Sequence, residues 1–547
     1  MDASLVLHNG KVYTVDEARP RVSAVAIAGG FVVAVGDDEQ MLALAGPETE
    51  VIDLAGRLAL PGLCDAHIHF YYWSLARKLA PVAGSPSREE MLARVWRWME
   101  SAPAGAWIAG WGWNENSWPD SSLPTRHDLD EITGSERPAL LWRVDMHAAV
   151  ANSAALRAAG IERGTPDPAG GLIGRDAAGR PDGMLWELAI NLVADKMPDP
   201  DPDILAAALE SGTAELHRLG VTAVHDQRMK DHYDGPVALA AYQALNRAGR
   251  LALRLNCNVA AHDLEHIESL GLASGFGDDY LRLGHVKLFT DGSMGSKTAW
   301  MLAPYEPGLD GDRTNTGVSV TPPEQMAAEF RRAAEASFPV SVHAIGDRAN
   351  RVVLDIFEEL GQSAPQPPIP HRIEHVQILD PADAPRLAAM GITASVQPVH
   401  AIDDMETAER VLGERAAHVY NFHTLAQSGA LLALGSDAPV ADPSPFLGIH
   451  AAVCRQRPEQ MEAGPWYGAE ALSLEQSIYG YTLGAAQAAG WQETIGSISP
   501  GKRADIAVLD RDLFAIVDAG VKDRELADTR VVMTIFDGRV VYAAAGD

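Results

Sequence analysis

Eight short apolar segments, spread between residues 62 and 437, constrain the fold of this chain more than any other feature. From the second segment onward they are separated by helical stretches, among them residues 323–337, 348–360 and 381–390. Strands that alternate with helices form a parallel sheet, and eight such repeats suit a closed barrel. The sequence therefore predicts an α/β fold, a (β/α)8 TIM barrel, with strands at residues 62–70, 221–227, 252–259, 283–290, 340–345, 372–376, 392–397 and 431–437.

Both ends of the chain contain strands only. Short β-branched runs fill about the first sixty residues, and a hairpin around Asp537-Gly538 follows a strand near residue 506. Strands at both ends of a long chain need partners, so we expect them to form one small β-sandwich. We place its N-terminal part at residues 1–61, the catalytic barrel at 62–490 and its C-terminal part at 491–547.

The gap between the first and second barrel strands is unusually long. About 150 residues intervene where one helix and two loops would suffice. We interpret residues from about 75 to 215 as an insertion after barrel strand 1. Loops that follow the strands of such a barrel line its active-site face, so the insertion is expected to shape the pocket.

The composition of the chain limits the kinds of molecule that it is expected to bind. The chain has 547 residues and a net charge of −30, which disfavours nucleic acid and anionic membrane surfaces as partners. Its three cysteines contain no CxxC pair, and no apolar run is long enough to span a membrane. Without a signal-like N-terminus, the expectation is a cytoplasmic protein acting on a small molecule, with a homodimer as the common default.

A histidine pair ends the first barrel strand. His67 and His69 are two residues apart, so both side chains point to the same side of a strand and can reach one metal ion. The alternative for so short a motif is a chance pair of surface or core histidines.

Four other predicted strands carry metal-competent side chains at or near their C-terminal ends. These residues are Lys287, His343, His375 and Asp437. In a barrel those ends meet on one face. Six such side chains on one face are hard to explain by solvation or packing, so we predict a metal site there.

The motifs around these residues resemble those of the amidohydrolase superfamily. The similarity is greatest to its amidohydrolase-3 branch, which includes N-substituted formamide deformylase and YtcJ-like metal-dependent hydrolases. It covers nearly the whole chain and rests on PGLCDAHIH from residue 61, KLFTDGS from 287, HAIGDRA from 343, IEH from 373, GSD from 435 and GKRAD from 501.

The resemblance implies two divalent metal ions. His67 and His69 would bind the more buried ion with Asp437, and His343 and His375 would bind the other. Lys287 would bridge both as a lysine carboxylated by carbon dioxide, because an ammonium cannot bind a cation whereas a carbamate can. The alternative is an ordinary lysine in a salt bridge. Zinc is the expected metal, with iron, manganese and nickel as alternatives.

The implied reaction is hydrolysis of a C–N bond in an amide, formamide or carbamate-like substrate. A hydroxide bridging the metals would attack the carbonyl, with Asp437 acting as general base and then as general acid. Three alternatives stay open: a mononuclear deaminase or esterase, a non-hydrolytic isomerase on the same scaffold, and a binding protein with a vestigial site. Lys287 argues against the deaminase, and the complete ligand set argues against decay.

Six residues are candidates for substrate contact: Trp113, Asn114, Asp145, His147, Asp291 and His400. The tryptophans of the insertion could form a wall for an apolar or aromatic substrate, but most fit the insertion's own core better. Residues 145–153 could instead serve as the start of a helix. His225 and Asp226, which end the second strand, are candidates for supporting the metal ligands.

Overall fold

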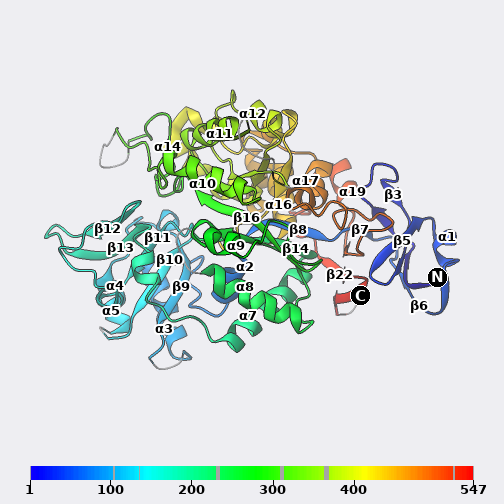
Figure 1. Cartoon of the computed structure of the whole chain (residues 1–547), viewed down its shortest axis with the longest axis horizontal. Coiled ribbons are helices and arrows are strands. Elements are labelled where there is room, and N and C mark those ends of the chain that lie inside the picture. The colour runs from blue at the N-terminus through cyan, green and yellow to red at the C-terminus, as the bar shows by residue number, and fades with distance from the viewer. Residues whose placement is uncertain are drawn as a thin grey trace.

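A barrel of eight parallel strands forms the centre of the molecule (Figure 1). The computed structural model describes residues 2–545 except 103–104, 135, 230–233, 308–312, 362–366, 368 and 522–523. All eight strands lie where the sequence predicts them: β8 (Leu63–Ile68), β14 (Val221–Asp226), β15 (Arg254–Ala260), β16 (Leu281–Phe289), β17 (Val340–Ala344), β18 (Arg372–His375), β19 (Thr393–Val396) and β20 (Leu432–Leu434).

The barrel strands are buried on both faces, as parallel strands between an interior and a ring of helices must be. The first and last strands join beyond the short β20. The amide of Asp437 donates to the carbonyl of His67 at 2.6 Å, and the amide of His69 donates to that of Ala438 at 2.8 Å. These two bonds bring the ends of the first and eighth strands together at one side of the site.

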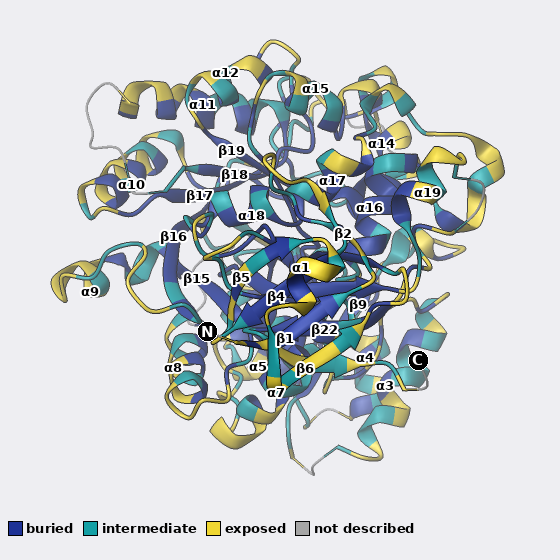
Figure 2. Ribbon diagram, turned by 90° about the vertical axis from the view of Figure 1, so that its right-hand side faces the viewer, coloured by how far each residue is buried: buried dark blue, intermediate teal, exposed yellow. Residues whose placement is uncertain are grey.

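Helices surround the barrel, with their apolar sides turned inward and exposed residues outside (Figure 2). In α11, for example, Val353, Leu354 and Phe357 are buried in the barrel core. The helices between barrel strands include α7 (Pro202–Arg218), α8 (Asp234–Arg247), α10 (Pro323–Glu335), α11 (Asp347–Gly361), α12 (Ala384–Ala389) and α13 (Pro398–Asp403).

The two chain ends form two sheets that share a core, which agrees with the predicted sandwich. One sheet, in the order β5-β4-β1-β6, is entirely N-terminal. The other, in the order β23-β22-β21-β7-β2-β3, mixes both ends, and β7 (Leu58–Pro61) pairs with β21 (Ile506–Leu509). The remaining strands are β1 (Ala3–His8), β2 (Lys11–Tyr13), β3 (Arg21–Val22), β4 (Ala24–Ala28), β5 (Phe31–Gly36), β6 (Ala45–Asp53), β22 (Val531–Phe536) and β23 (Arg539–Ala543).

The segment after β8 builds a five-stranded mixed sheet in the order β12-β13-β11-β10-β9. It lies at the opposite end of the molecule from the terminal sheets (Figure 1). The same segment contains the helix α3 (Arg88–Met99) and a hairpin of β12 (Gly171–Arg175) with β13 (Pro181–Glu187). The other strands are β9 (Ile108–Trp113), β10 (Ala139–Arg143) and β11 (Ala148–Ala151).

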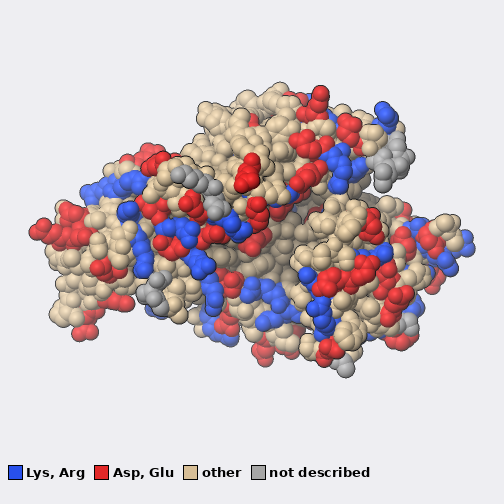
Figure 3. All heavy atoms as spheres, turned by 180° about the vertical axis from the view of Figure 1, so that it is seen from behind, with Lys and Arg blue, Asp and Glu red and all other residues tan. Residues whose placement is uncertain are grey.

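Acidic and basic side chains are mixed over the face seen in Figure 3, despite the net charge of −30. Among the helices in the described ranges, none combines the length and apolar character needed to cross a membrane.

Candidate metal centre and substrate pocket

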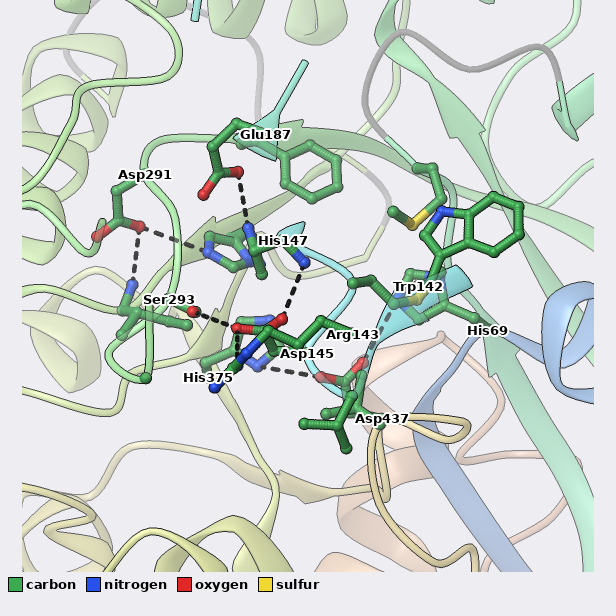
Figure 4. Close-up of a pocket in the computed structure, with 18 of the residues that line it drawn as sticks. His69, Trp142, Arg143, Asp145, His147, Glu187, Asp291, Ser293, His375 and Asp437 are labelled. Carbon is green, nitrogen blue, oxygen red and sulfur yellow. Dashed lines mark hydrogen bonds and ion pairs between the residues drawn. The ribbon is translucent and has the colours of Figure 1, made fainter. Parts of the chain in front are cut away.

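A cavity of about 330 Å³ opens at the C-terminal ends of the barrel strands (Figure 4). Barrel strands or the segments just after them contribute His69, Lys287, His343, His375 and Asp437 to its lining. The insertion contributes the opposite wall. The cavity therefore lies between the metal-competent side chains and the inserted sheet, as the strand order led us to expect.

Asp437 is surrounded by histidine nitrogens. Its Oδ1 is 3.2 Å from His67 Nε2 and 3.4 Å from His69 Nε2. The facing atoms His67 Nε2 and Asp437 Oδ1 are buried and have no hydrogen-bond partner among the described residues. Buried polar atoms are rarely left unpaired, and imidazole nitrogens with a carboxylate oxygen are the donors that zinc-like ions prefer. These three residues therefore fit a divalent metal ion.

A second group of potential ligands shares Asp437 and consists of His375, His400 and Asp437. The Oδ2 atom of Asp437 is 3.9 Å from His400 Nε2. His400 was expected to contact substrate, and the structure brings it as close to Asp437 as His375 is.

His343 lies beside these groups but in neither of them. Its ring centroid is 4.6 Å from that of His375. Its Nε2 faces the carbonyl of Gly292 at 3.1 Å and Asp291 Oδ1 at 3.5 Å. The sequence therefore predicted its place in the pocket, but not this orientation.

Lys287 is buried within β16, and its Nζ lies 4.9 Å from the ring centroid of Phe289. Burial disfavours the ammonium and lowers the pKa of Lys287 to about 8, although Glu374 and Asp437 oppose this shift. A lysine with this pKa has a substantial neutral fraction near neutral pH, and the neutral amine is the form that can react with carbon dioxide.

Glu374 orients the ring of His67. Its Oε2 is 2.6 Å from His67 Nδ1, and its Oε1 accepts hydrogen bonds from Ser341 and from Arg372. Burial alone would raise the pKa of Glu374, but Arg372 and His67 hold it well below its usual value. A carboxylate on Nδ1 fixes the proton there and leaves Nε2 free for a metal ion. Glu374 was not among the predicted site residues, although it lies two residues from Arg372 and so on the same side of β18.

We expect Glu374→Gln to weaken metal binding by about 10–100-fold, because an amide is a weaker partner for His67 and leaves Arg372 without its counter-charge. Metal titration followed by calorimetry would measure the effect. The control is Glu358→Gln on the exposed side of α11, in an exposed ion pair with Arg386. Equal metal affinity in both variants would contradict this role for Glu374.

The inserted sheet is fastened to the loop after β16. Asp145 Oδ2 accepts hydrogen bonds from Ser293 at 2.7 Å, from Ser296 at 2.8 Å and from Arg143 at 2.7 Å. Asn114, another predicted contact, lines the pocket and accepts from Arg143 at 3.3 Å. Asp145 lines the pocket as predicted, but these bonds make it first a link between the insertion and the barrel.

His147 projects from the same wall. Its Nδ1 is 2.8 Å from Glu187 Oε2, and its ring centroid is 5.3 Å from that of His343 (Figure 4). Burial would lower the pKa of His147, but Glu187 and Asp145 outweigh it and raise the pKa to about 9. Asp291 also lines the pocket, and it accepts the amide protons of Ile345 and Gly346.

Trp113 lies outside the cavity, in contrast to the prediction. It is fully buried in the core of the insertion, where its indole donates to the carbonyl of Leu141 at 2.9 Å. The tryptophan that lines the pocket is Trp142. A register shift between β9 and β10 falls next to Trp142, beside Gly112, whose φ is +102°. The sequence does not reveal this irregularity in the sheet, so it could not predict which of the two tryptophans lines the cavity.

Replacing these two tryptophans should have different effects. Trp113→Ala should lower the free energy of unfolding by about 3–5 kcal/mol, because it empties a packed core. Trp142→Ala should cost much less stability and should raise KM for apolar substrates, because the ring borders the cavity. Chemical denaturation and steady-state kinetics distinguish them, and similar stability losses in both variants would contradict the assignment.

Comparison with known proteins shows the family to which the chain belongs. Residues 50–542 match the model of the amidohydrolase family. YtcJ of Bacillus subtilis is 32% identical over 539 residues, which are 98% of this chain and 99% of the relative. The N-substituted formamide deformylase of Arthrobacter pascens is 29% identical over 556 residues, 99% of each chain.

A solved structure shares the fold. The crystal structure of an uncharacterized metal-dependent hydrolase from Pyrococcus horikoshii superposes with a TM-score of 0.74 at 28% identity, and the match covers 93% of this chain and 97% of that one. The family match spans the β8, β17 and β18 motifs and the C-terminal strands β21, β22 and most of β23, and it begins after β5. This chain therefore belongs to the amidohydrolase family, within the superfamily of metal-dependent hydrolases.

Proposed function

We propose that the protein hydrolyses a C–N bond in a small amide, formamide or carbamate-like compound. The observation that carries this proposal is the position of Asp437. Its Oδ1 faces the nitrogens of His67 and His69, its Oδ2 lies 3.9 Å from His400 Nε2, and the residue lines the cavity. A carboxylate beside metal ligands and open to substrate suits proton transfer in a hydrolytic reaction.

His67, His69, His375 and Asp437 would hold divalent metal ions, with Lys287, as a carbamate, and His343 completing the set. Metal ions bound there would supply an acidified water molecule and polarise the substrate carbonyl. Asp437 would accept one proton of that water as its oxygen bonds to the carbonyl carbon. It would then give this proton to the nitrogen as the C–N bond breaks, so that water and amide become acid and amine.

The pocket supports a substrate with an apolar part. Trp142, Phe289, Leu188 and Ile190 line it beside the polar groups. N-substituted formamides are the first compounds to test, because a relative matched over 99% of its length bears the name of a deformylase for them. Formanilide, which would release formate and aniline, is a simple probe of this class.

The test is elemental analysis of protein purified without chelator, together with hydrolysis of a panel of amides, formamides and esters that includes formanilide. The proposal predicts about two metal ions per chain, loss of hydrolysis on chelation, and recovery with zinc and bicarbonate. A ratio near one would favour a mononuclear enzyme and leave Lys287 as a structural lysine. A ratio near zero, with no activity regained, would overturn the proposal.

A further inference from the structure

His400 differs from the other histidines around Asp437 in how its ring is held. It lies in the first turn of α13, directly after β19. Its Nε2 is buried and has no hydrogen-bond partner among the described residues. The nearest charged atom, Asp437 Oδ2, is 3.9 Å away, which is too far for a hydrogen bond. This nitrogen is therefore free to meet an atom of a bound molecule.

The partner of Nδ1 decides which nitrogen of each ring carries the proton. His67 Nδ1 meets the carboxylate of Glu374, and His375 Nδ1 meets the amide oxygen of Gln397 at 2.8 Å. Both partners only accept, so Nδ1 carries the proton and Nε2 presents a lone pair. The Gln397 amide is held in this direction, because its Nε2 donates to the carbonyl of Ser395 at 3.3 Å. His67 thus turns its unprotonated Nε2 toward Asp437, as a metal ligand would. His375 has its protonated Nδ1 3.9 Å from Asp437 Oδ2, so only its Nε2 is available to bind a metal ion.

His400 has the reverse arrangement. The amide nitrogen of Gln377 donates to His400 Nδ1 at 3.3 Å. An Nδ1 that accepts a hydrogen bond carries no proton, so the neutral ring carries its proton on Nε2. A protonated nitrogen cannot bind a metal ion, but it can donate a hydrogen bond. The two kinds of ring stand side by side: the centroids of His375 and His400 are 6.4 Å apart, with their planes inclined by 17°.

We propose that His400 is a catalytic residue that donates its Nε2–H to the substrate oxygen on which negative charge develops, and that it is not a metal ligand. This inference rests on the proposed function. As water adds to the carbonyl carbon, the second electron pair of the C=O bond moves onto that oxygen, while the proton stays on His400. The donor stands on the Oδ2 side of Asp437, so the carboxylate and His400 face the same reacting carbonyl group from neighbouring positions. Gln377 is the positioning residue that keeps the proton on Nε2.

The test compares His400→Gln and His400→Phe with the control His418→Phe, which replaces an exposed histidine at the end of η3 (Gly413–His418). Metal content, thermal unfolding and hydrolysis of formanilide are measured for each. Both His400 variants should keep the wild-type metal content. For His400→Phe, kcat should fall about 10²–10³-fold, as is usual when one donor to an oxyanion is removed, with a much smaller change in KM. His400→Gln should lose less, because its amide can still donate.

A Gln377→Met variant tests the positioning role, and its kcat should fall about tenfold with unchanged metal content. Loss of metal in both His400 variants would identify His400 as a ligand and overturn the inference. An unchanged kcat in His400→Phe would overturn it as well.

Failure of the proposed function would look different, because wild-type protein would then bind metal without hydrolysing formanilide. In that case acetohydroxamate, which offers a carbonyl oxygen to a metal site, is the probe. Calorimetry on metal-loaded protein should show weaker binding to His400→Phe by about 10–100-fold, with equal metal content. Equal affinity in wild type and variant, or no binding to wild type, would overturn the inference.

Discussion

Asp437→Asn is expected to lower kcat about 10³-fold while the protein keeps its metal. An asparagine amide has the same shape as the carboxylate, but it cannot accept and return a proton. The local backbone should stay in place, because it is the amide of residue 437 that bonds to the carbonyl of His67. Burial would raise the pKa of Asp437, yet His67, His69 and His375 hold it well below its usual value, which favours the carboxylate form that can accept a proton.

The control for this variant is Asp442→Asn, which changes an exposed aspartate five residues further along the chain. Metal per chain and kcat are measured on the same preparations, so that loss of metal and loss of the base can be separated. Asp437→Asn protein with full metal content and near wild-type kcat would contradict the role of Asp437 in proton transfer.

Lys287→Met should also lower activity strongly, in this case because the protein binds less metal. Methionine fills the same apolar space but cannot form a carbamate, so the metal content should fall below that of wild type. Activity should fall more than about 100-fold, which exceeds the usual loss when a group that only supports a ligand is removed. Elemental analysis and kinetics on the panel of amides, formamides and esters would measure the metal content and the activity.

The matched control is Lys196→Met, which replaces an exposed lysine in the insertion. Wild-type protein gives a second check. Metal loading in carbon dioxide-free buffer should give little activity, and added bicarbonate should restore it. If Lys287→Met keeps the wild-type metal content and activity, Lys287 is a structural residue.

The barrel was predictable because its signals are local. Each strand is a short apolar run, and the metal-competent residues stand at strand ends that a barrel must bring together. For the same reason the sequence placed Lys287, His375 and Asp437 in one pocket without any knowledge of the loops. The residue boundaries predicted for the insertion and for the terminal parts of the chain stay predictions, because strand order alone does not define where one folding unit ends.

The details of the site were not predictable, because they depend on contacts between distant segments. Trp113 and Trp142 look alike in sequence, but Trp142 lines the cavity, whereas Trp113, next to the shifted register between β9 and β10, lies in the core of the insertion. The different roles of His375 and His400 depend on which atom of a nearby glutamine faces each ring. The role of Glu374 could not be predicted, because a carboxylate next to a histidine in the sequence can have many roles. The structure shows that its partner is His67.

The pairing of β7 with β21 has a consequence for how the protein is made. Strand β7 continues through Gly62 into β8, which carries His67, and its partner β21 begins only at Ile506. A ribosome synthesises residue 506 long after residue 67, so the sheet behind the first predicted metal ligands stays incomplete until β21 has been made. The nascent chain must therefore keep the edge of β7 that pairs with β21 unpaired until then.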